Sequence, residues 1–444
     1  MNRVGFRRGF AALHVRNYRL YWTGQIISRV GTWMQQVSLP WLVLALGGSP
    51  IQLGIVAALE FVPALLLAPF GGVYADRLDK RRAILVTQTL ASAQVVVLFV
   101  LTVSGVVTIP IIMVMALALG LVNAADMPLR QSLAAELVPP NILTNAIALN
   151  SMAFNSARVV GPAVAGVTIA IGTDLFHTAT AGVAFNLAIN AISYSAVLVS
   201  LWMMDPTQIR RPRQPETQVP VLESLREGIG YAVHTPIVLW ALVLLGVIST
   251  FGLNFRILLP LFTVDVLRLD ADVYGVLYAS MGLGSLAGAI TLAFMSQRRA
   301  VALMIGGGLM FGVFELGLGV TRNGLLAVPL LMGVGFFSML MINTINATVQ
   351  ANVSDELRGR VMSLYVTVFA GSSPIGGIFA GVVAENWDVP LTFILGAIIS
   401  LGAVGLVWWR LRRAGHAGRL GRTRIGVGDR YEELPEAQEP SLSQ

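Results

Sequence analysis

Long apolar runs recur along the whole chain and constrain its fold more than any other feature. A helix needs about 20 apolar residues to cross the roughly 30 Å hydrocarbon core of a bilayer, and the 444-residue sequence contains twelve runs of this kind. Charged residues make up only 12% of the chain, about half their share in an ordinary soluble domain. The sequence therefore predicts an all-α membrane protein with twelve transmembrane helices.

The distribution of basic residues predicts how these helices are oriented. Most of the 30 lysines and arginines fall in alternate connections and in the two tails, and they give the chain a net charge of +7. Such an excess of cations marks the cytoplasmic side of a membrane protein. We therefore expect both termini in the cytoplasm, and we attribute the basic balance to topology in a lipid bilayer rather than to a nucleic-acid partner.

Residues typical of enzyme sites are scarce. Cysteine is absent and the four histidines lie far apart, so the sequence predicts no disulfide and no metal site. It contains no Gly-x-Ser-x-Gly sequence and no Walker-type loop, which are typical of hydrolases and nucleotide-binding proteins. We therefore expect no enzyme, no cofactor and no direct use of ATP, which leaves an ion gradient as the energy source.

A polar, proline-containing stretch divides the chain into two groups of six helices. The expected order is a cytoplasmic lead, a first bundle, a cytoplasmic linker, a second bundle and a disordered cytoplasmic tail, at residues 1–18, 19–204, 205–235, 236–411 and 412–444. Features of the first half return in the second. The clearest is Asn123, Asp126 and Arg130, which return at the same helical spacing as Asn343, Asn346 and Gln350. Two pseudo-symmetric bundles are therefore predicted.

A charged loop, GGVYADRLDKRR from Gly71 to Arg82, lies between the second and third apolar runs. It resembles the loop signature of the major facilitator superfamily of secondary transporters. The matching positions are Gly72, Asp76, Arg77, Lys80 and Arg81. Asp79 departs from the pattern, in which glycine is the commoner residue.

Three further stretches carry the resemblance. GPAVAG at Gly161–Gly166 is similar to the fifth-span motif of exporters, with Ala165 where a second glycine is usual. RNYRLYWTGQIISRVGTWMQ and ELRGRVMSLY are similar to the branch of enterobactin exporters and macrolide or drug efflux proteins, of the transmembrane secretion effector type. The resemblance covers residues 10–412. It implies a bacterial inner-membrane protein in which helices 1, 4, 7 and 10 surround a central cavity.

The resemblance also implies that the charged loop latches the two halves together at the cytoplasmic side. The alternative is a loop whose cations only fix the topology. Asp126 and Arg130 lie one turn apart, so either they neutralise each other or Asp126 exchanges partners with Arg77 or Arg81. The expected latch consists of Gly72, Asp76, Arg77, Lys80, Arg81, Asp126 and Arg130.

Polar residues inside the apolar runs predict the walls of the cavity. Gln25, Arg29 and Gln36 lie within about 40° of one another on a helix, and polar groups inside a bilayer face a bundle interior or water. Arg29, Arg158 and Arg256 either bond to carbonyls or Glu60, or bind an anionic substrate. The expected cavity residues are Gln25, Arg29, Gln36, Asn123, Arg158, Asn254, Arg256, Asn343, Asn346 and Gln350.

Three acidic residues within the spans are candidates for proton coupling: Glu60, Asp126 and Glu315. Each is either a proton carrier or a neutral, hydrogen-bonded structural acid. Gly161, Pro162 and Gly166 form the expected export motif, in which glycine permits close helix packing and proline kinks the helix. The direction of transport is implied by the resemblance alone.

The leading functional hypothesis is proton-driven export, by alternating access, of a small organic molecule. The cargo is expected to be a siderophore-like metabolite or an antibiotic, and the protein is expected to act as a monomer. The alternatives are an importer or lipid flippase of the same fold and, from another class, a membrane-embedded enzyme or receptor.

Overall fold

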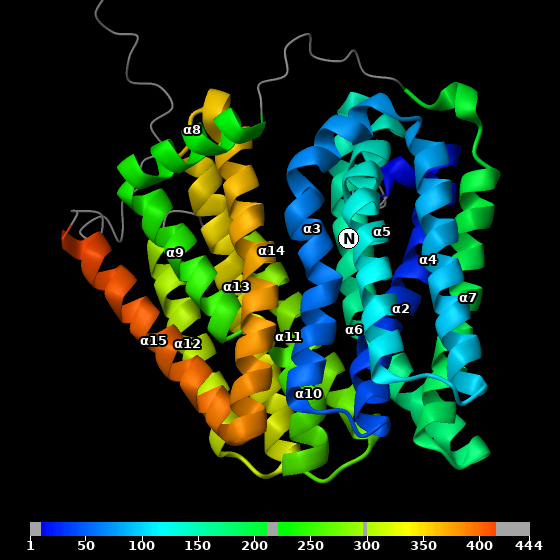
Figure 1. Ribbon diagram of the computed structural model, residues 1–444. Coiled ribbons are helices and arrows are strands. Elements are labelled where there is room, and N and C mark those ends of the chain that lie inside the picture. The colour runs from blue at the N-terminus through cyan, green and yellow to red at the C-terminus, as the bar shows by residue number, and fades with distance from the viewer. Residues whose placement is uncertain (1–9, 211–220, 296–299, 414–444) are drawn as a thin grey trace, which may run out of the picture.

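The computed structural model describes residues 10–210, 221–295 and 300–413, except for the side chains of residues 68–77, 221–225, 293–294 and 355–356. Within these ranges the regular structure is helical (Figure 1). The expected latch residues Gly72, Asp76 and Arg77 belong to a described helix, but their side chains lie outside the described part. Residues 1–9 of the expected lead and 414–444 of the expected tail also lie outside it.

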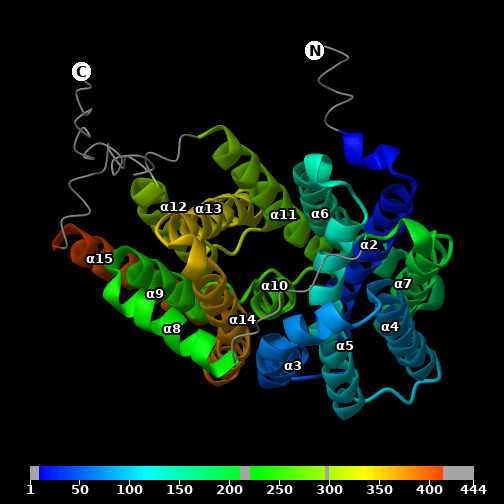
Figure 2. The same ribbon diagram turned by 90° about the horizontal axis from the view of Figure 1, so that it is seen from above.

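The first half contains six long helices in chain order: α2 (Arg16–Ala45), α3 (Pro50–Arg77), α4 (Lys80–Val103), α5 (Ile109–Glu136), α6 (Leu143–Phe176) and α7 (Ala179–Trp202). The second half contains α8 (Val221–His234), α9 (Pro236–Phe251), α10 (Phe255–Leu261), α11 (Ala271–Phe294), α12 (Ala300–Val320), α13 (Gly324–Ala351), α14 (Asp355–Asn386) and α15 (Val389–Arg413). Short turns include η1 (Ala11–His14), η2 (Pro140–Ile142), η3 (Pro206–Gln208) and the π-helical η4 (Phe262–Val266). Figure 2 shows the halves as two bundles side by side, with α10 between them.

Eleven helical segments in the described ranges are long and apolar enough to cross a membrane. The helix α2, at the place of the expected first span, is not among them. It is 30 residues long, and polar residues such as Gln25, Arg29, Gln35 and Gln36 lower its hydropathy. The structure therefore supports a multi-span helical protein, and the twelfth span stays a prediction.

The seventh span is broken, whereas the sequence predicted one continuous helix over residues 236–262. The helix α9 ends at Phe251, and α10 begins at Phe255 after three non-helical residues. At the break, the Leu253 amide reaches back to the Ile248 carbonyl at 3.1 Å. Ser249, Thr250, Gly252 and Asn254 lie at the break, so a local sequence signal was present within an otherwise apolar run.

The helix α8 lies within the expected linker and was not predicted. It packs against the second half: the Tyr231 hydroxyl donates to the Asn352 carbonyl at 2.8 Å, and Glu227 forms an ion pair with Arg360 of α14. This end of the linker is therefore attached to the second bundle.

Two helix crossings hold the halves together. The helix α3 packs against α14, where Gly54 lies against the Gly377 carbonyl, and α6 packs against α11. A Cβ atom added to Gly166 would lie 2.7 Å from the Gly275 Cα atom. Because these contacts join backbone to backbone, only residues without side chains allow them.

A polar contact closes one end of the α3–α14 crossing. The Glu385 carboxylate of α14 accepts hydrogen bonds from the Ser49 hydroxyl at 2.7 Å and the Ile51 amide at 2.9 Å. Both donors lie at the N-terminus of α3, where free amides and the helix dipole favour an anion. The halves are therefore tied at the end where α3 begins and α14 finishes.

Candidate functional site

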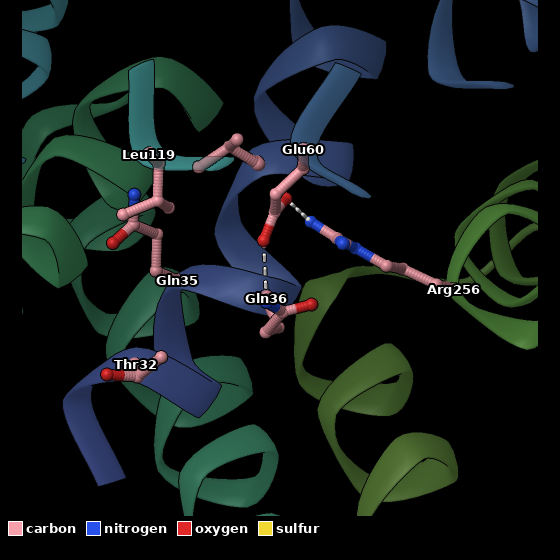
Figure 3. Close-up of a pocket in the computed structure, with 7 residues that line it drawn as sticks. Thr32, Gln35, Gln36, Glu60, Leu119 and Arg256 are labelled. Carbon is pink, nitrogen blue, oxygen red and sulfur yellow. Dashed lines mark hydrogen bonds and ion pairs between the residues drawn. The ribbon is translucent and has the colours of Figure 1, made fainter. Parts of the chain in front are cut away.

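An ion pair joins the two halves at a narrow pocket. Glu60 of α3 pairs with Arg256 of α10, and the Gln36 side-chain amide of α2 donates to the other Glu60 oxygen at 2.9 Å (Figure 3). Glu60 is only 5% exposed. The pocket is lined by Thr32, Gln35, Gln36, Leu39, Glu60, Leu119 and Arg256. The structure thus brings together Gln36 and Arg256, which were expected in the cavity, and Glu60, which was expected in proton coupling. Of the partners expected for Arg256, the structure shows Glu60.

The break in the seventh span positions Arg256. Arg256 is the second residue of α10, so it leaves the helix directly after the break. The Asn254 side chain, expected in the cavity, instead donates to the Thr250 carbonyl at 2.8 Å across the break. Arg256 also lies over the Phe61 ring at 5.8 Å, and its buried Nη1 atom has no hydrogen-bond partner. The site therefore offers an unused donor beside the ion pair.

A second polar network lies entirely within the first half. Asp126 and Arg130 of α5 form an ion pair, and Gln25 of α2 accepts from Arg130. From α4, the Thr87 hydroxyl and the Gln88 amide donate to Asp126 at 2.6 and 3.0 Å. Asp126 and Arg130 thus neutralise each other here, and the network connects α2, α4 and α5.

The other expected cavity residues divide into two groups. Arg29 lies over Phe154 at 5.6 Å and Arg158 lies over Trp33 at 5.9 Å, and the buried Arg158 Nε atom has no hydrogen-bond partner. The amides lie on α5 and α13: Asn123 and Asn343 are half-buried, and the Gln350 amide donates to Asn346 at 2.6 Å. These residues do not line the pocket at Glu60.

The described part of the expected latch makes contacts within the first half. Lys80 forms a buried ion pair with Glu136 at the end of α5. Arg81 donates to the carbonyls of Leu201 and Trp202 at 2.7 and 3.0 Å, at the end of α7. Glu136 was not among the residues expected from the sequence. Its position as an acidic residue at the end of an apolar run could have indicated it.

Asp79, the residue that departs from the superfamily pattern, has a local role. Its carboxylate accepts a hydrogen bond from the Arg82 amide at 3.1 Å and so caps the N-terminus of α4. Aspartate is among the best residues at this position, because the first amides of a helix have no partner within it. The departure therefore supplies a helix cap.

The expected export motif faces two different neighbours. Gly161 lies against Trp33 of α2, within the first half, and Gly166 lies against Gly275 of α11, in the second half. The Pro162 carbonyl also lies close to Gly275, 2.9 Å from the position of a Cβ atom there. The motif on α6 thus contributes to two contacts: Gly161 packs within the first bundle, and Gly166 packs against the second.

Glu315, the third candidate for proton coupling, lies apart from this pocket. It is fully buried on α12, and neither carboxyl oxygen has a hydrogen-bond partner among the described residues. The three acidic candidates therefore have different surroundings: Glu60 links the halves, Asp126 belongs to a network of one half, and Glu315 has no partner in the described part of the chain.

The sequence matches the family model described as transmembrane secretion effector over residues 7–418. The chain belongs to this family. Curated relatives of this chain are transporters of the major facilitator superfamily. They include the Staphyloferrin A transporter of Staphylococcus aureus, 27% identical over 89% of this chain and 96% of the relative. The multidrug efflux pump Tap of Mycolicibacterium fortuitum is 26% identical, with coverages of 85% and 91%.

A third relative and two solved structures agree with this assignment. The macrolide efflux protein A of Streptococcus pyogenes is 22% identical, covering 85% of this chain and 92% of the relative. A mutant of the nucleoside transporter NupG matches this chain with a TM-score of 0.69 at 13% identity, covering 88% of this chain and 99% of the other. A bacterial homologue of the lysosomal transporter Spinster has a TM-score of 0.68 at 13% identity, with coverages of 91% and 97%. These structures show the fold, and the family is one of multi-span membrane transporters rather than enzymes.

Proposed function

We propose that this transporter works by alternating access and exports a small organic molecule, driven by protons. The names of two relatives support export, because one is a multidrug efflux pump and another is a macrolide efflux protein. The proposed cargo is a siderophore-like metabolite or an antibiotic. We propose Glu60 as the principal coupling acid, with Asp126 as the second candidate.

The observation that carries this proposal is the ion pair between Glu60 and Arg256. It connects helices of the two halves and is almost completely buried. A proton on Glu60 removes one of the two charges, and Arg256 then loses the partner that compensates for its burial. A proton-driven carrier requires a titratable group of this kind, whose partner changes between conformations.

The surroundings of Arg256 support an anionic cargo. Its Nη1 atom has no hydrogen-bond partner, and a guanidinium group matches a carboxylate or catecholate with paired donors. Arg158 adds a second arginine with an unused buried donor. We propose that these two groups, with Gln36, contact the substrate.

Transport in everted membrane vesicles tests the function. Vesicles with the wild-type protein are expected to accumulate a radiolabelled siderophore or macrolide when a proton gradient is imposed, and to lose the accumulation when a protonophore is added. Accumulation that survives the protonophore would contradict proton coupling. Accumulation only in right-side-out vesicles would indicate an importer, and movement of fluorescent lipid alone would indicate a flippase.

We further propose twelve spans, with α2 as the first and both termini in the cytoplasm of a bacterial cell. At about 1.5 Å per residue, the 30 residues of α2 are long enough to cross a bilayer. The chain contains no cysteine, so single cysteines report their location without background. In intact cells, a membrane-impermeant maleimide is expected to label Ser104→Cys but not Thr207→Cys. The opposite pattern would reverse the topology.

A further inference from the structure

A buried polar cluster lies in the second half, away from the Glu60 pocket, where α9, α12 and α15 pack together (Figure 2). Its central group is Glu315, which has no exposed surface and whose two oxygens have no hydrogen-bond partner among the described residues. None of the ion pairs formed by the described residues includes it. Because an unpaired buried carboxylate costs several kcal/mol, this group is either protonated or accompanied by a cation.

The break between α9 and α10 supplies a second oxygen. The Phe251 carbonyl, the last of α9, accepts no backbone hydrogen bond within the described chain, because the helix stops at Gly252. The Phe251 carbonyl oxygen and the Glu315 carboxylate both lie close to Gly396 of α15. A Cβ atom at Gly396 would lie 2.6 Å from the Phe251 oxygen and 2.8 Å from Glu315 Oε1.

Ser400 supplies a third oxygen from the same face of α15, one turn after Gly396. Its buried hydroxyl has no hydrogen-bond partner among the described residues. A Cβ atom at Gly252 would lie 2.9 Å from this hydroxyl oxygen. Gly396 thus borders both the carboxylate and the carbonyl, and Gly252 borders the hydroxyl, and neither glycine places a Cβ atom against these oxygens.

We propose that Glu315, the Phe251 carbonyl and Ser400 form a binding site for a dehydrated sodium ion. Hard cations prefer oxygen ligands, and the C-terminal end of an interrupted membrane helix presents free carbonyls with a negative partial charge. One carboxylate balances one positive charge, so a monovalent ion leaves the apolar surroundings neutral. A divalent ion would leave an uncompensated charge there.

This site is separate from the proposed proton coupling at Glu60 and does not depend on it. A sodium ion at the break would fix the end of α9, which precedes Arg256 on α10, relative to α12 and α15. The protein can therefore fail to export a tested cargo and still bind sodium.

Thermal unfolding of the purified full-length protein in detergent tests the site. At about pH 8, we expect the Tm in 100 mM sodium chloride to exceed that in 100 mM choline chloride by about 3 °C, because the ion binds only the folded state. Glu315→Gln is expected to abolish this difference. Ser400→Ala keeps the carboxylate and removes one ligand, so the difference should shrink and half-saturation should require several times more sodium.

Glu60→Gln is the matched control, because it removes another buried carboxylate and should keep the sodium-dependent shift. Equal Tm values of the wild-type protein in the two salts would overturn the proposal, as expected if a proton alone occupies Glu315. A shift that survives in Glu315→Gln, or that disappears in Glu60→Gln, would also overturn it. If Glu315→Gln does not fold, an undiminished shift in Ser400→Ala decides against the site.

Discussion

On α5 of the first half, Asp126 and Arg130 form an ion pair one turn apart, whereas at the matching positions of α13 the amides Asn346 and Gln350 form a neutral hydrogen bond. The two helices thus share the spacing of the pair, but the charged residues of α5 are replaced by neutral amides on α13. A neutral pair is satisfied on its own, but a buried ion pair needs further hydrogen bonds. The first half provides them from α2 and α4, so this ion pair ties three of its helices together.

The largest expected effect comes from breaking the charged pair on one side. Arg130→Met leaves Asp126, which is 3% exposed, without its cation and should destabilise the protein by about 3–5 kcal/mol. The matching change Gln350→Met, at an exposed residue, should cost less than about 0.5 kcal/mol. Unfolding in mixed detergent measures both. Equal losses would show that the two halves do not differ at this position.

The ion pair between the halves should matter for transport more than the partly exposed pair within the second half. Glu60→Gln leaves Arg256 unpaired and is expected to slow proton-driven transport about tenfold, as a loss of about 1.4 kcal/mol does. Glu227→Gln, at the partly exposed pair with Arg360, should change it less than about twofold. Vesicle uptake, normalised to protein in the membrane, gives the comparison. A Glu60→Gln variant as fast as Glu227→Gln would exclude Glu60 from coupling.

Replacing the charged pair of α5 by the amides found on α13 tests whether the pair serves folding stability or transport. Asp126→Asn combined with Arg130→Gln removes both charges together, so folding should change by only about 1 kcal/mol. If Asp126 exchanges partners during gating, transport should fall while the amount of protein in the membrane is unchanged. Normal transport by this double variant would leave the pair with a structural role only.

The smallest expected effect concerns Asp79, which caps α4. Asp79→Gly restores the commoner residue of the superfamily pattern and should cost only a few tenths of a kcal/mol, because glycine is also accepted at this position. Asp79→Leu, which offers no acceptor, should cost about 1 kcal/mol. Thermal unfolding of the two variants checks the cap, and a loss in Asp79→Gly as large as in Asp79→Leu would contradict it.

The sequence predicted elements whose signal is local. Long apolar helices were expected, and the described ranges contain eleven of them, because hydropathy is a property of consecutive residues. The stripe of Gln25, Arg29 and Gln36 could be placed on one helix for the same reason. Helical spacing likewise placed Arg130 one turn from Asp126. Arg130 was therefore one expected partner of Asp126, the alternative being Arg77 or Arg81, and the structure shows the pair with Arg130.

Contacts between distant segments could not be predicted in the same way. Glu60 and Arg256 are 196 residues apart, and sequence alone left Arg256 with a choice between carbonyls, Glu60 and substrate. The helix break at Gly252 lies within a segment that is apolar on average, although Gly252 and Asn254 mark the break locally. The ion pair of Lys80 with Glu136 depends on where α4 and α5 end relative to each other, which no pattern within either helix determines.

The glycine crossings of α3 with α14 and α6 with α11 have a mechanical consequence. Interlocking side chains must change rotamers when two helices move relative to each other. Helices that touch through glycine backbone can change their crossing angle without such rotamer changes. Two such crossings define a line, and a rigid rotation of one bundle about it displaces each atom in proportion to its distance from that axis. A tilt of a few degrees would thus move the remote helix ends much further than the glycines themselves.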